Sequence, residues 1–128
     1  MAGKIVLADT SILIDFFRKT DKSNSQLLSL VRLDYSFCIS AITEYEIYTG
    51  ATENQYQYWQ EFLKKTQVLA FDKDVAKVAV EISKALKIKR KQIDIADLFI
   101  AATAIENNMP LATLNKKHFE RIENLQII

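Results

Sequence analysis

The sequence has very few of the residues that break or crosslink a chain. Its 128 residues include 2 glycines and 1 proline, which leaves little material for long loops or linkers. Cys38 is the single cysteine, so no internal disulfide can form, and with only one histidine a structural zinc cluster is excluded. No hydrophobic run approaches the roughly 18 residues of a membrane span. We therefore expect a single domain over residues 1–128 that has no membrane partner.

The overall charge is nearly balanced, with 17 Lys and Arg against 16 Asp and Glu. A net charge of +1 neither supports nor excludes a nucleic-acid partner, because local fields matter more than the sum. The apolar run after Lys4 covers only Ile5 to Ala8, which is too short for a secretory signal. Together with a lone cysteine in an apolar segment, this favours a cytoplasmic protein with a reduced thiol.

Short apolar segments alternate with amphipathic ones along the chain. The alternation predicts an α/β fold, in which helices cover both faces of a central parallel sheet of about four or five strands. Helices are expected between the strands, and the most apolar of them covers residues 95–107. The predicted strands are residues 4–8, 36–39, 68–71, 111–114 and a last one at 125–128.

Polar residues follow these strands at the edge where open α/β sheets have their functional sites. Asp9 comes directly after the first strand, Glu46 follows the second after a short connection, and Asn115 follows the fourth. Asp97 stands at the front of the most apolar helix, where an unpaired acid is costly. If Asp9, Glu46 and Asp97 meet, their repulsion requires a cation. Acids around a divalent metal are the usual apparatus for cleaving phosphodiesters.

Each acid also has an ordinary structural explanation. Thr43 and Glu46 have the spacing of a capping box, and Asp94 with Asp97 resembles one. An acid in the first helical turn is stabilised by about 0.3–1 kcal/mol through the helix macrodipole. Ser11 and Asp94 are the predicted caps of the helices that follow them. The residues alone therefore leave a metal site and a set of helix starts as alternatives.

Four segments carry a recognisable pattern: residues 6–11 (VLADTS), 39–50 (ISAITEYEIYTG), 97–104 (DLFIAATA) and 111–119 (LATLNKKHF). In this order and at these separations they resemble the motifs of the PIN-domain family, specifically its VapC-type toxin ribonucleases. The segments run from the first strand to the last helix, so the resemblance covers nearly the whole chain.

The resemblance implies a three-layer α/β/α sandwich and an endoribonuclease that depends on Mg²⁺ or Mn²⁺. By motif position it implies that Asp9, Glu46 and Asp97 are the metal-site acids. We assign Asp9 and Asp97 as the principal metal ligands and Glu46 as the residue that holds or deprotonates the attacking water. The resemblance also implies a cognate antitoxin protein and a homodimer as partners, in addition to the RNA substrate.

Several polar residues near the acids are expected to support them. Thr10, Ser11, Thr113 and Asn115 are candidates to hydrogen-bond the carboxylates and to fix their rotamers. His118 occupies the position where many relatives carry a further acid, which weakens the case for a tightly held second metal. A neutral imidazole can bind a metal or orient a water, although a lone histidine is more often structural.

Two other functions are compatible with the sequence. A phospho-acceptor signalling domain has a similar length and also gathers acids and Mg²⁺ at strand ends. It needs an acceptor aspartate after the third strand, where the nearest acid is Asp72, a candidate helix cap. A non-catalytic binding protein with the PIN fold is the other alternative, which the departure from the family pattern at His118 leaves open.

The remaining charged residues are interpreted as surface features. The densest basic run lies within residues 84–91 and suits a phosphate backbone or a solvated helix end equally well. Asp15 and Asp21 are interpreted as surface or cap residues.

Overall fold

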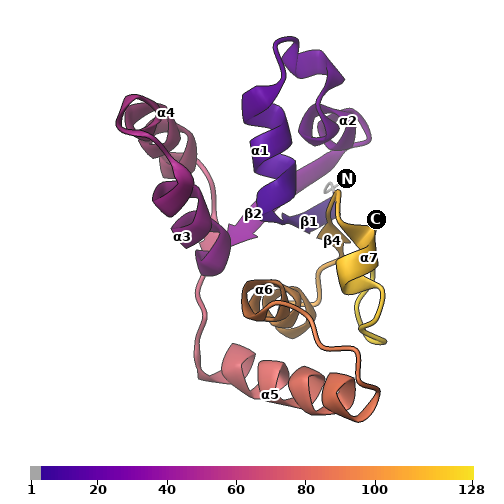
Figure 1. Ribbon diagram of the computed structural model, residues 1–128. Coiled ribbons are helices and arrows are strands. Elements are labelled where there is room, and N and C mark those ends of the chain that lie inside the picture. Colours follow the sequence, from indigo (N-terminus) through magenta and orange to yellow (C-terminus); the bar gives the residue numbers. More distant parts are fainter. Residues whose placement is uncertain (1–3) are drawn as a thin grey trace.

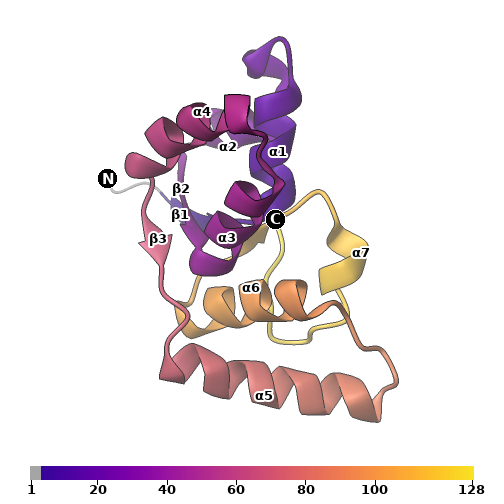
Figure 2. The same ribbon diagram turned by 60° about the vertical axis from the view of Figure 1, so that its left-hand side comes forward.

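The computed structural model describes residues 4–128 as alternating strands and helices (Figures 1 and 2). The first half contains β1 (Lys4–Ala8), α1 (Thr10–Arg18), the 3-10 helix η1 (Lys22–Asn24), α2 (Gln26–Arg32), β2 (Tyr35–Ser40), α3 (Ala41–Gly50) and α4 (Glu53–Lys64). The second half contains β3 (Val68–Leu69), α5 (Lys73–Ile88), α6 (Ile95–Glu106), β4 (Leu111–Ala112) and α7 (Lys116–Phe119). The predicted α/β class is confirmed.

The four strands form one parallel sheet in the order β3-β2-β1-β4. Lys4 of β1 lies opposite Tyr35 of β2, and Leu7 of β1 lies opposite Leu111 of β4. The chain builds the sheet outward from β1 through β2 to β3, and then adds β4 on the other side of β1. The carboxyl ends of β1 and β4 therefore flank the point where the strand order reverses. Open α/β sheets form their binding crevice at this point.

The two outer strands are shorter than predicted, with two residues each in place of 68–71 and 111–114. Their partners end first. β2 passes into α3 after Ser40, and β1 turns toward α1 after Ala8, so neither outer strand has a neighbour to pair with further along. The residues that follow β4 are consequently free of the ladder and lie at the edge of the sheet where the crevice forms.

The last segment of the chain is not a strand, which corrects the prediction for 125–128. It makes one isolated parallel bridge, in which Ile127 lies opposite Leu111. The Leu111 N–H donates to the Gln126 carbonyl (2.8 Å), and the Ile128 N–H donates to the Leu111 carbonyl (2.9 Å). Because β4 has only two residues, it offers no longer ladder to extend.

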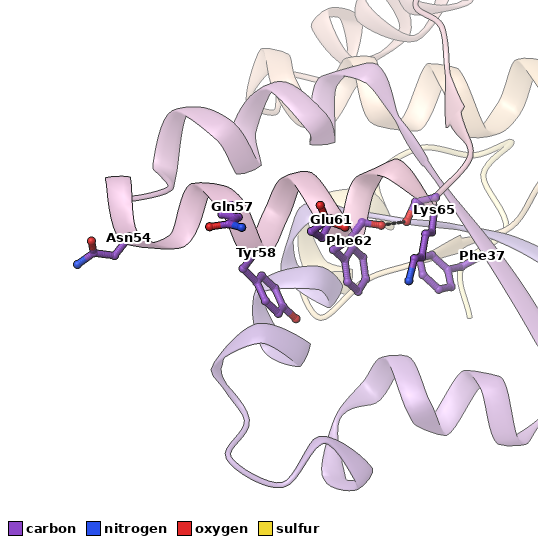
Figure 3. Close-up of a pocket in the computed structure, with 8 residues that line it drawn as sticks. Phe37, Asn54, Gln57, Tyr58, Glu61, Phe62 and Lys65 are labelled. Carbon is purple, nitrogen blue, oxygen red and sulfur yellow. Dashed lines mark hydrogen bonds between the residues drawn. The ribbon is translucent and has the colours of Figure 1, made fainter.

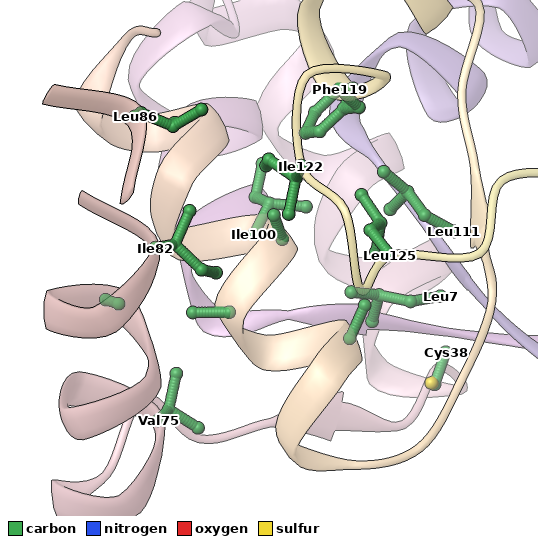
Figure 4. Packing of buried hydrophobic residues seen from close by; sticks show 14 residues of the cluster. Leu7, Cys38, Val75, Ile82, Leu86, Ile100, Leu111, Phe119, Ile122 and Leu125 are labelled. Atoms are coloured by element: carbon green, nitrogen blue, oxygen red, sulfur yellow. The ribbon is translucent and has the colours of Figure 1, made fainter. Parts of the chain in front are cut away.

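Two hydrophobic cores lie on opposite faces of the sheet. Side chains alternate along a strand, so Val6 and Ala8 enter one core and Leu7 enters the other. The first core includes Trp59 and lies between the sheet and α1 to α4. The second includes Ile100 and lies between the sheet and the helices α5 and α6 (Figure 4). This arrangement confirms the three-layer α/β/α sandwich.

Helix α6 is apolar on nearly all sides because it is enclosed between the sheet and α5 (Figures 1 and 2). Its buried residues form the continuous run 100–104. Within the described part of the chain, none of the helices combines the length and the apolar character that crossing a bilayer requires. The apolar run of α6 is therefore explained by its place inside the fold.

Two strand ends supply the caps of the helices that follow. Asp9 is the N-cap of α1 and accepts the N–H of Ile12 (3.3 Å), so the prediction of Ser11 as the cap is wrong. Ser40, at the end of β2, caps α3 by accepting the N–H of Thr43 (3.1 Å). The capping side chains of both helices thus lie at the same edge of the sheet.

Candidate active site

A cavity of about 630 Å³ opens at this edge of the sheet, and we call it the carboxylate cavity. Asp9 lines it from the end of β1, Glu46 lines it from α3, and Asp97 lines it from the first turn of α6. Three acids from three distant segments therefore surround one space, as the sequence predicts. Helix α3, which carries Glu46, contacts both α1, which Asp9 caps, and α6, which carries Asp97 (Figure 2).

Asp9 is deeply enclosed, with 3% of its surface exposed. Its Oδ1 accepts hydrogen bonds from the Ser11 hydroxyl (2.5 Å) and the Ile12 N–H (3.3 Å), and its Oδ2 accepts one from the Thr113 hydroxyl (2.5 Å). Burial raises the pKa of Asp9 above its ordinary value of 3.8; these hydrogen bonds lower the pKa, and the charge of Asp97 raises it. The surrounding hydroxyls hold the carboxylate in one orientation.

Glu46 is half-buried and is held by a residue of α1. The Thr10 hydroxyl donates to its Oε1 (2.5 Å) and lies 3.1 Å from the hydroxyl of Thr43. A capping box between Thr43 and Glu46 is wrong as an explanation, because Ser40 is the cap and Thr43 lies inside the helix. The carboxylate of Glu46 is therefore not engaged at the start of α3, and it lines the cavity.

Asp97 is partly exposed and contacts the only histidine of the sequence. Its Oδ2 lies 3.2 Å from Nδ1 of His118. Burial raises the pKa of Asp97, the hydrogen bond and charge of His118 lower it, and the charge of Asp94 raises it. Asp94 has the N-cap position of α6, as predicted, but its side chain makes no capping hydrogen bond. The charge of Asp94 therefore acts on the neighbouring carboxyl of Asp97.

Leu114 and Asn115 line one side of the cavity, and we call the segment that they begin, residues 114–118, the ridge. The hydroxyls that hold the buried aspartate also hold the ridge. The Leu114 N–H donates to Oγ of Ser11 (3.0 Å), and the Asn115 N–H donates to Oγ1 of Thr113 (2.9 Å). Leu114 and Asn115 both line the cavity. The position of the ridge is therefore tied to the same hydrogen-bond network as the carboxylate.

The structure distributes the predicted supporting residues over two kinds of contact. The hydroxyls of Thr10, Ser11 and Thr113 each donate to a carboxylate of the cavity. His118 contacts a carboxylate through its imidazole, and Asn115 lines the cavity with its backbone bonded to a hydroxyl.

Sequence reasoning predicts Thr10 and Ser11 of α1 beside the acids, but it missed the later residues of this helix that reach the cavity. Asp15, Arg18 and Lys19 also line it, whereas the sequence places Asp15 at the surface or at a cap. The side chain of Asp15 is only 16% exposed, lies 3.6 Å from the ammonium group of Lys19, and accepts the N–H of Gln26 (2.9 Å). A signal was present, since Ser11, Asp15 and Arg18 recur at a spacing that puts them on one helical face.

The donor atoms of the cavity suit a hard divalent cation. Mg²⁺ and Mn²⁺ prefer carboxylate oxygens, and the cavity offers those of Asp9, Glu46 and Asp97. Within residues 4–128, however, no three Asp, Glu, His or Cys side chains are arranged to hold one ion as they stand. The fit to a metal therefore rests on the chemistry of the donors and not on a finished coordination geometry.

The phospho-acceptor alternative lacks the residue that it requires. Asp72, the nearest acid after β3, accepts the N–H of Val75 (3.0 Å) as the N-cap of α5. It does not line the carboxylate cavity, and α5 lies beyond α6 from the sheet (Figure 2). In the described chain, the acid after the third strand thus has a structural task away from the other acids.

A cavity on α4 is of a different kind. It has a volume of about 660 Å³ and is lined by the rings of Phe37, Tyr58 and Phe62 (Figure 3). Glu61 is the single acid among the described residues that line it, beside Lys65. Without a group of acids this cavity offers no set of ligands for a divalent metal. The carboxylate cavity is accordingly the candidate for chemistry.

Comparisons with known proteins identify the family. A family model described as "PIN domain" matches residues 6–125. Among solved structures, the DNA-bound VapBC complex of Salmonella typhimurium contains a chain that superimposes with a TM-score of 0.86 at 25% identity, over 98% of this chain and 96% of that one. A chain of VapBC2 from Rickettsia felis, bound to a promoter DNA fragment, gives a TM-score of 0.81 at 28% identity, over 97% of both chains.

Proteins that are similar in amino-acid sequence point to the same family. Ribonuclease VapC1 of Methanocaldococcus jannaschii is 38% identical over 121 residues, which cover 92% of this chain and 81% of the relative. Ribonuclease VapC19 of Mycobacterium tuberculosis is 26% identical over 120 residues, or 94% of this chain and 96% of the relative. The chain therefore belongs to the PIN-domain family, within its VapC group.

Proposed function

We propose that this protein is a metal-dependent endoribonuclease and the toxin component of a toxin–antitoxin pair. The observation that supports this most is the convergence of Asp9, Glu46 and Asp97 on one cavity at the reversal point of the sheet. The family supports it as well, because relatives that match 92% and 94% of the chain carry the name ribonuclease.

Each of the three acids has a role in this proposal. Asp9 and Asp97 would hold a Mg²⁺ or Mn²⁺ ion, and Glu46 would hold the attacking water or take its proton. The ion, when bound, lowers the pKa of a water and offsets charge on the scissile phosphate. Ser11 and Thr113 keep the carboxylate of Asp9 fixed, so that no side-chain freedom is lost when a cation binds.

The hydrogen bond from Thr10 suits the role of Glu46. The hydroxyl donates to Oε1 and leaves Oε2 available for a water. Because Thr10 is the first residue of α1 and Asp9 immediately precedes it, the backbone turn at the end of β1 sets the positions of both acids. A proton acceptor and a metal ligand are thereby kept in a constant relation.

The partners follow from the group to which the chain belongs. The solved relatives include VapBC assemblies and a toxin–antitoxin complex from Klebsiella pneumoniae. We therefore propose a cognate antitoxin protein as the partner of this chain, together with a homodimer and an RNA substrate in the cytoplasm.

The proposal is tested by incubating the purified protein with total RNA, with Mg²⁺, with Mn²⁺ or with EDTA. We expect discrete cleavage products in either metal, none in EDTA, and a loss of about a thousandfold or more in rate for Asp9→Asn. Asp72→Asn is the matched control, because it removes an acid that caps α5 and does not line the cavity.

Two outcomes would contradict the proposal. Stabilisation by metal without cleavage of any RNA would identify a non-catalytic member of the family. Equal loss of cleavage in Asp9→Asn and Asp72→Asn would indicate general damage to the fold and remove the case for a special role of Asp9.

A further inference from the structure

A second cavity of about 630 Å³ adjoins the carboxylate cavity, on the other side of the ridge. We call it the lysine cavity. Its apolar wall comes from α1 and α2, from the ridge and from the end of the chain, and includes Leu30, Leu33, Leu114 and Ile128. Leu33 is 64% exposed and Leu114 is 50% exposed, so this wall is open to a ligand.

The charges around the two cavities have opposite signs. Lys116, Lys117 and His118 line the lysine cavity, and among the described residues no Asp or Glu does. The carboxylate cavity has four acids on its walls against two bases, Arg18 and Lys19, so negative charge predominates there. A polyanion is repelled by this excess of acids, and Lys116 and Lys117 offer it a neighbouring surface on which cations have no acids beside them.

The ridge joins the cavities physically. Leu114 and Asn115 line both of them. His118 lines the lysine cavity with its exposed ring and at the same time contacts Asp97 of the carboxylate cavity (3.2 Å). A ligand that spans the ridge therefore touches the two cavities at once.

The ridge is also held in place. Two of its backbone N–H groups, those of Leu114 and Asn115, donate to the hydroxyls of Ser11 and Thr113, and those hydroxyls donate to Asp9. The spacing between the lysine cavity and the buried carboxylate is consequently set by four hydrogen bonds. A rigid relation of this kind fixes where a bound strand presents its next phosphate.

We propose that the lysine cavity binds the nucleotide that flanks the scissile phosphate of a single-stranded RNA. The base and sugar lie on the apolar wall at Leu33 and Leu114, and the adjoining phosphate lies against Lys116 and Lys117. This inference rests on the proposed nuclease function, for which it names the part of the substrate that the ridge positions. The open apolar wall and the cations together match one nucleotide unit, which has an apolar face and an anionic link.

The test is binding of a fluorescent 12-nucleotide single-stranded RNA of random sequence, followed by anisotropy in EDTA at several salt concentrations. Each phosphate contact contributes about 0.7 to the slope of log K against log salt for single strands. We expect the double variant Lys116→Gln with Lys117→Gln to bind more weakly and to lose about 1.4 from that slope. We expect Leu33→Gln to weaken binding about fivefold with the slope unchanged.

The matched control is Lys73→Gln with Lys77→Gln. It removes the same charge from the first half of α5. The beginning of α5 is the end of that helix that lies farther from α7 (Figures 1 and 2). We expect the control to bind RNA like the wild type. An equal change of slope in both double variants would overturn the proposal, because it would make net charge the cause.

Crosslinking locates the bound strand directly. With 4-thiouridine in the RNA, we expect the attached nucleotides at residues 29–33 or 114–118. Crosslinks confined to other segments would overturn the proposal, as would absence of RNA binding by the wild type at low salt. If Leu33→Gln leaves RNA binding unchanged but disrupts a complex with a protein partner, the occupant is a peptide and the RNA assignment is wrong.

These readouts separate the inference from the function on which it rests. Binding and crosslinking are measured in EDTA, where no cleavage is expected, whereas the nuclease proposal is judged by cleavage in Mg²⁺ or Mn²⁺. RNA that binds at the lysine cavity but is never cleaved would contradict the nuclease proposal alone. RNA that is cleaved without contacts at the lysine cavity would contradict this inference alone.

Discussion

The carboxylate cavity and the lysine cavity have similar volumes, share the ridge, and are built in opposite ways. The first depends on Asp9, which is buried and hydrogen-bonded to two hydroxyls and one backbone N–H. The second depends on Lys116 and Lys117, which are exposed at the start of the short helix α7. The difference teaches that the fold fixes the carboxylate proposed for catalysis in one orientation. It leaves the lysine side chains proposed to bind the RNA exposed to solvent.

The two cavities also differ in what they do to stability. Burial raises the pKa of Asp9 and of Asp97, so the ionised carboxylates are less stable in the folded state than in water. The exposed lysines remain hydrated and bear no such penalty. Functional sites commonly reduce stability in this way, and a bound cation or a neutralising substitution relieves it.

The largest expected effect is stabilisation by metal, and it separates the cavities. At a free Mg²⁺ concentration one hundred times the Kd, the native state gains about 2.7 kcal/mol, which raises the melting temperature by roughly 10 °C. We expect Asp9→Asn to abolish most of this rise and the double lysine variant to retain it, as measured by calorimetry with Mg²⁺ or EDTA. A rise lost equally in both variants would show that the cavities do not act separately.

A smaller effect on stability is expected from removing the hydroxyl of Thr113, which lines the lysine cavity and donates to Asp9 of the carboxylate cavity. Thr113→Val removes the donor to Oδ2 of Asp9 and the acceptor of the Asn115 N–H. We expect it to lower the free energy of unfolding by about 1–3 kcal/mol in urea denaturation, because a buried charge loses a partner. Thr103→Val is the matched control, since the hydroxyl of buried Thr103 donates only to the Phe99 carbonyl of its own helix (2.8 Å).

The outcome for this pair sharpens the comparison. The control should lose less than about 1 kcal/mol, because the helix carbonyl already accepts a backbone hydrogen bond. If Thr103→Val destabilises the protein as much as Thr113→Val does, the hydrogen bond from Thr113 to Asp9 contributes no more to stability than an ordinary buried hydroxyl does. The hydrogen bonds of Thr113 that connect Asp9 to the ridge would then not stabilise the fold.

The smallest effect is a dependence on pH that belongs to the carboxylate cavity alone. The pKa of Asp9 is about 3.8 in the unfolded chain and is higher in the folded state. At a pH between the unfolded-state pKa and the folded-state pKa, the folded state therefore binds more protons than the unfolded state. The free energy of unfolding therefore falls as pH rises through this window. In EDTA, we expect Asp9→Asn to be more stable relative to the wild type at pH 7 than at pH 4.

Asp21 provides a control of opposite sign. Hydrogen bonds from Ser23 lower the pKa of this exposed carboxyl, which caps η1. Its contribution to stability is present above its unfolded pKa and is lost as pH falls through the folded pKa. The free energy of unfolding of Asp21→Asn should accordingly fall further below that of the wild type at pH 7 than at low pH. For Asp9→Asn, the opposite result would contradict the raised pKa of Asp9: a free energy of unfolding that increases, relative to that of the wild type, as the pH falls from 7 to 4.

Much of the fold was predictable because its signals are local. The apolar run before Asp9 and the spacing of the helical stripes determine the elements, and their alternation determines the three layers. The lengths of β3 and β4 were not predictable in this way. They depend on where β1 and β2 end, which is a property of the neighbouring strands and not of the residues in β3 and β4.

Asp9 and Asp97 could be selected because one follows a strand directly and the other stands in the first turn of an apolar helix, whereas Glu46 lies inside α3 and is selected by its position in the family motif. The same reasoning could not assign Asp9 as the cap of α1, since Ser11 is an equally good cap on paper. Nor could it find the lysine cavity. That cavity requires α2 to lie beside the ridge, and no motif links these two segments of the chain.

The hydrogen bond between Asp9 and Thr113 joins residues that are 104 positions apart. A ribosome that adds 5–20 residues per second needs about 5 to 20 seconds to make the stretch between them. During that time the growing polypeptide contains the first acid but not the hydroxyl that orients it or the lysines that follow. The hydrogen-bond network of the proposed nuclease site is therefore completed only when synthesis of the chain is nearly finished.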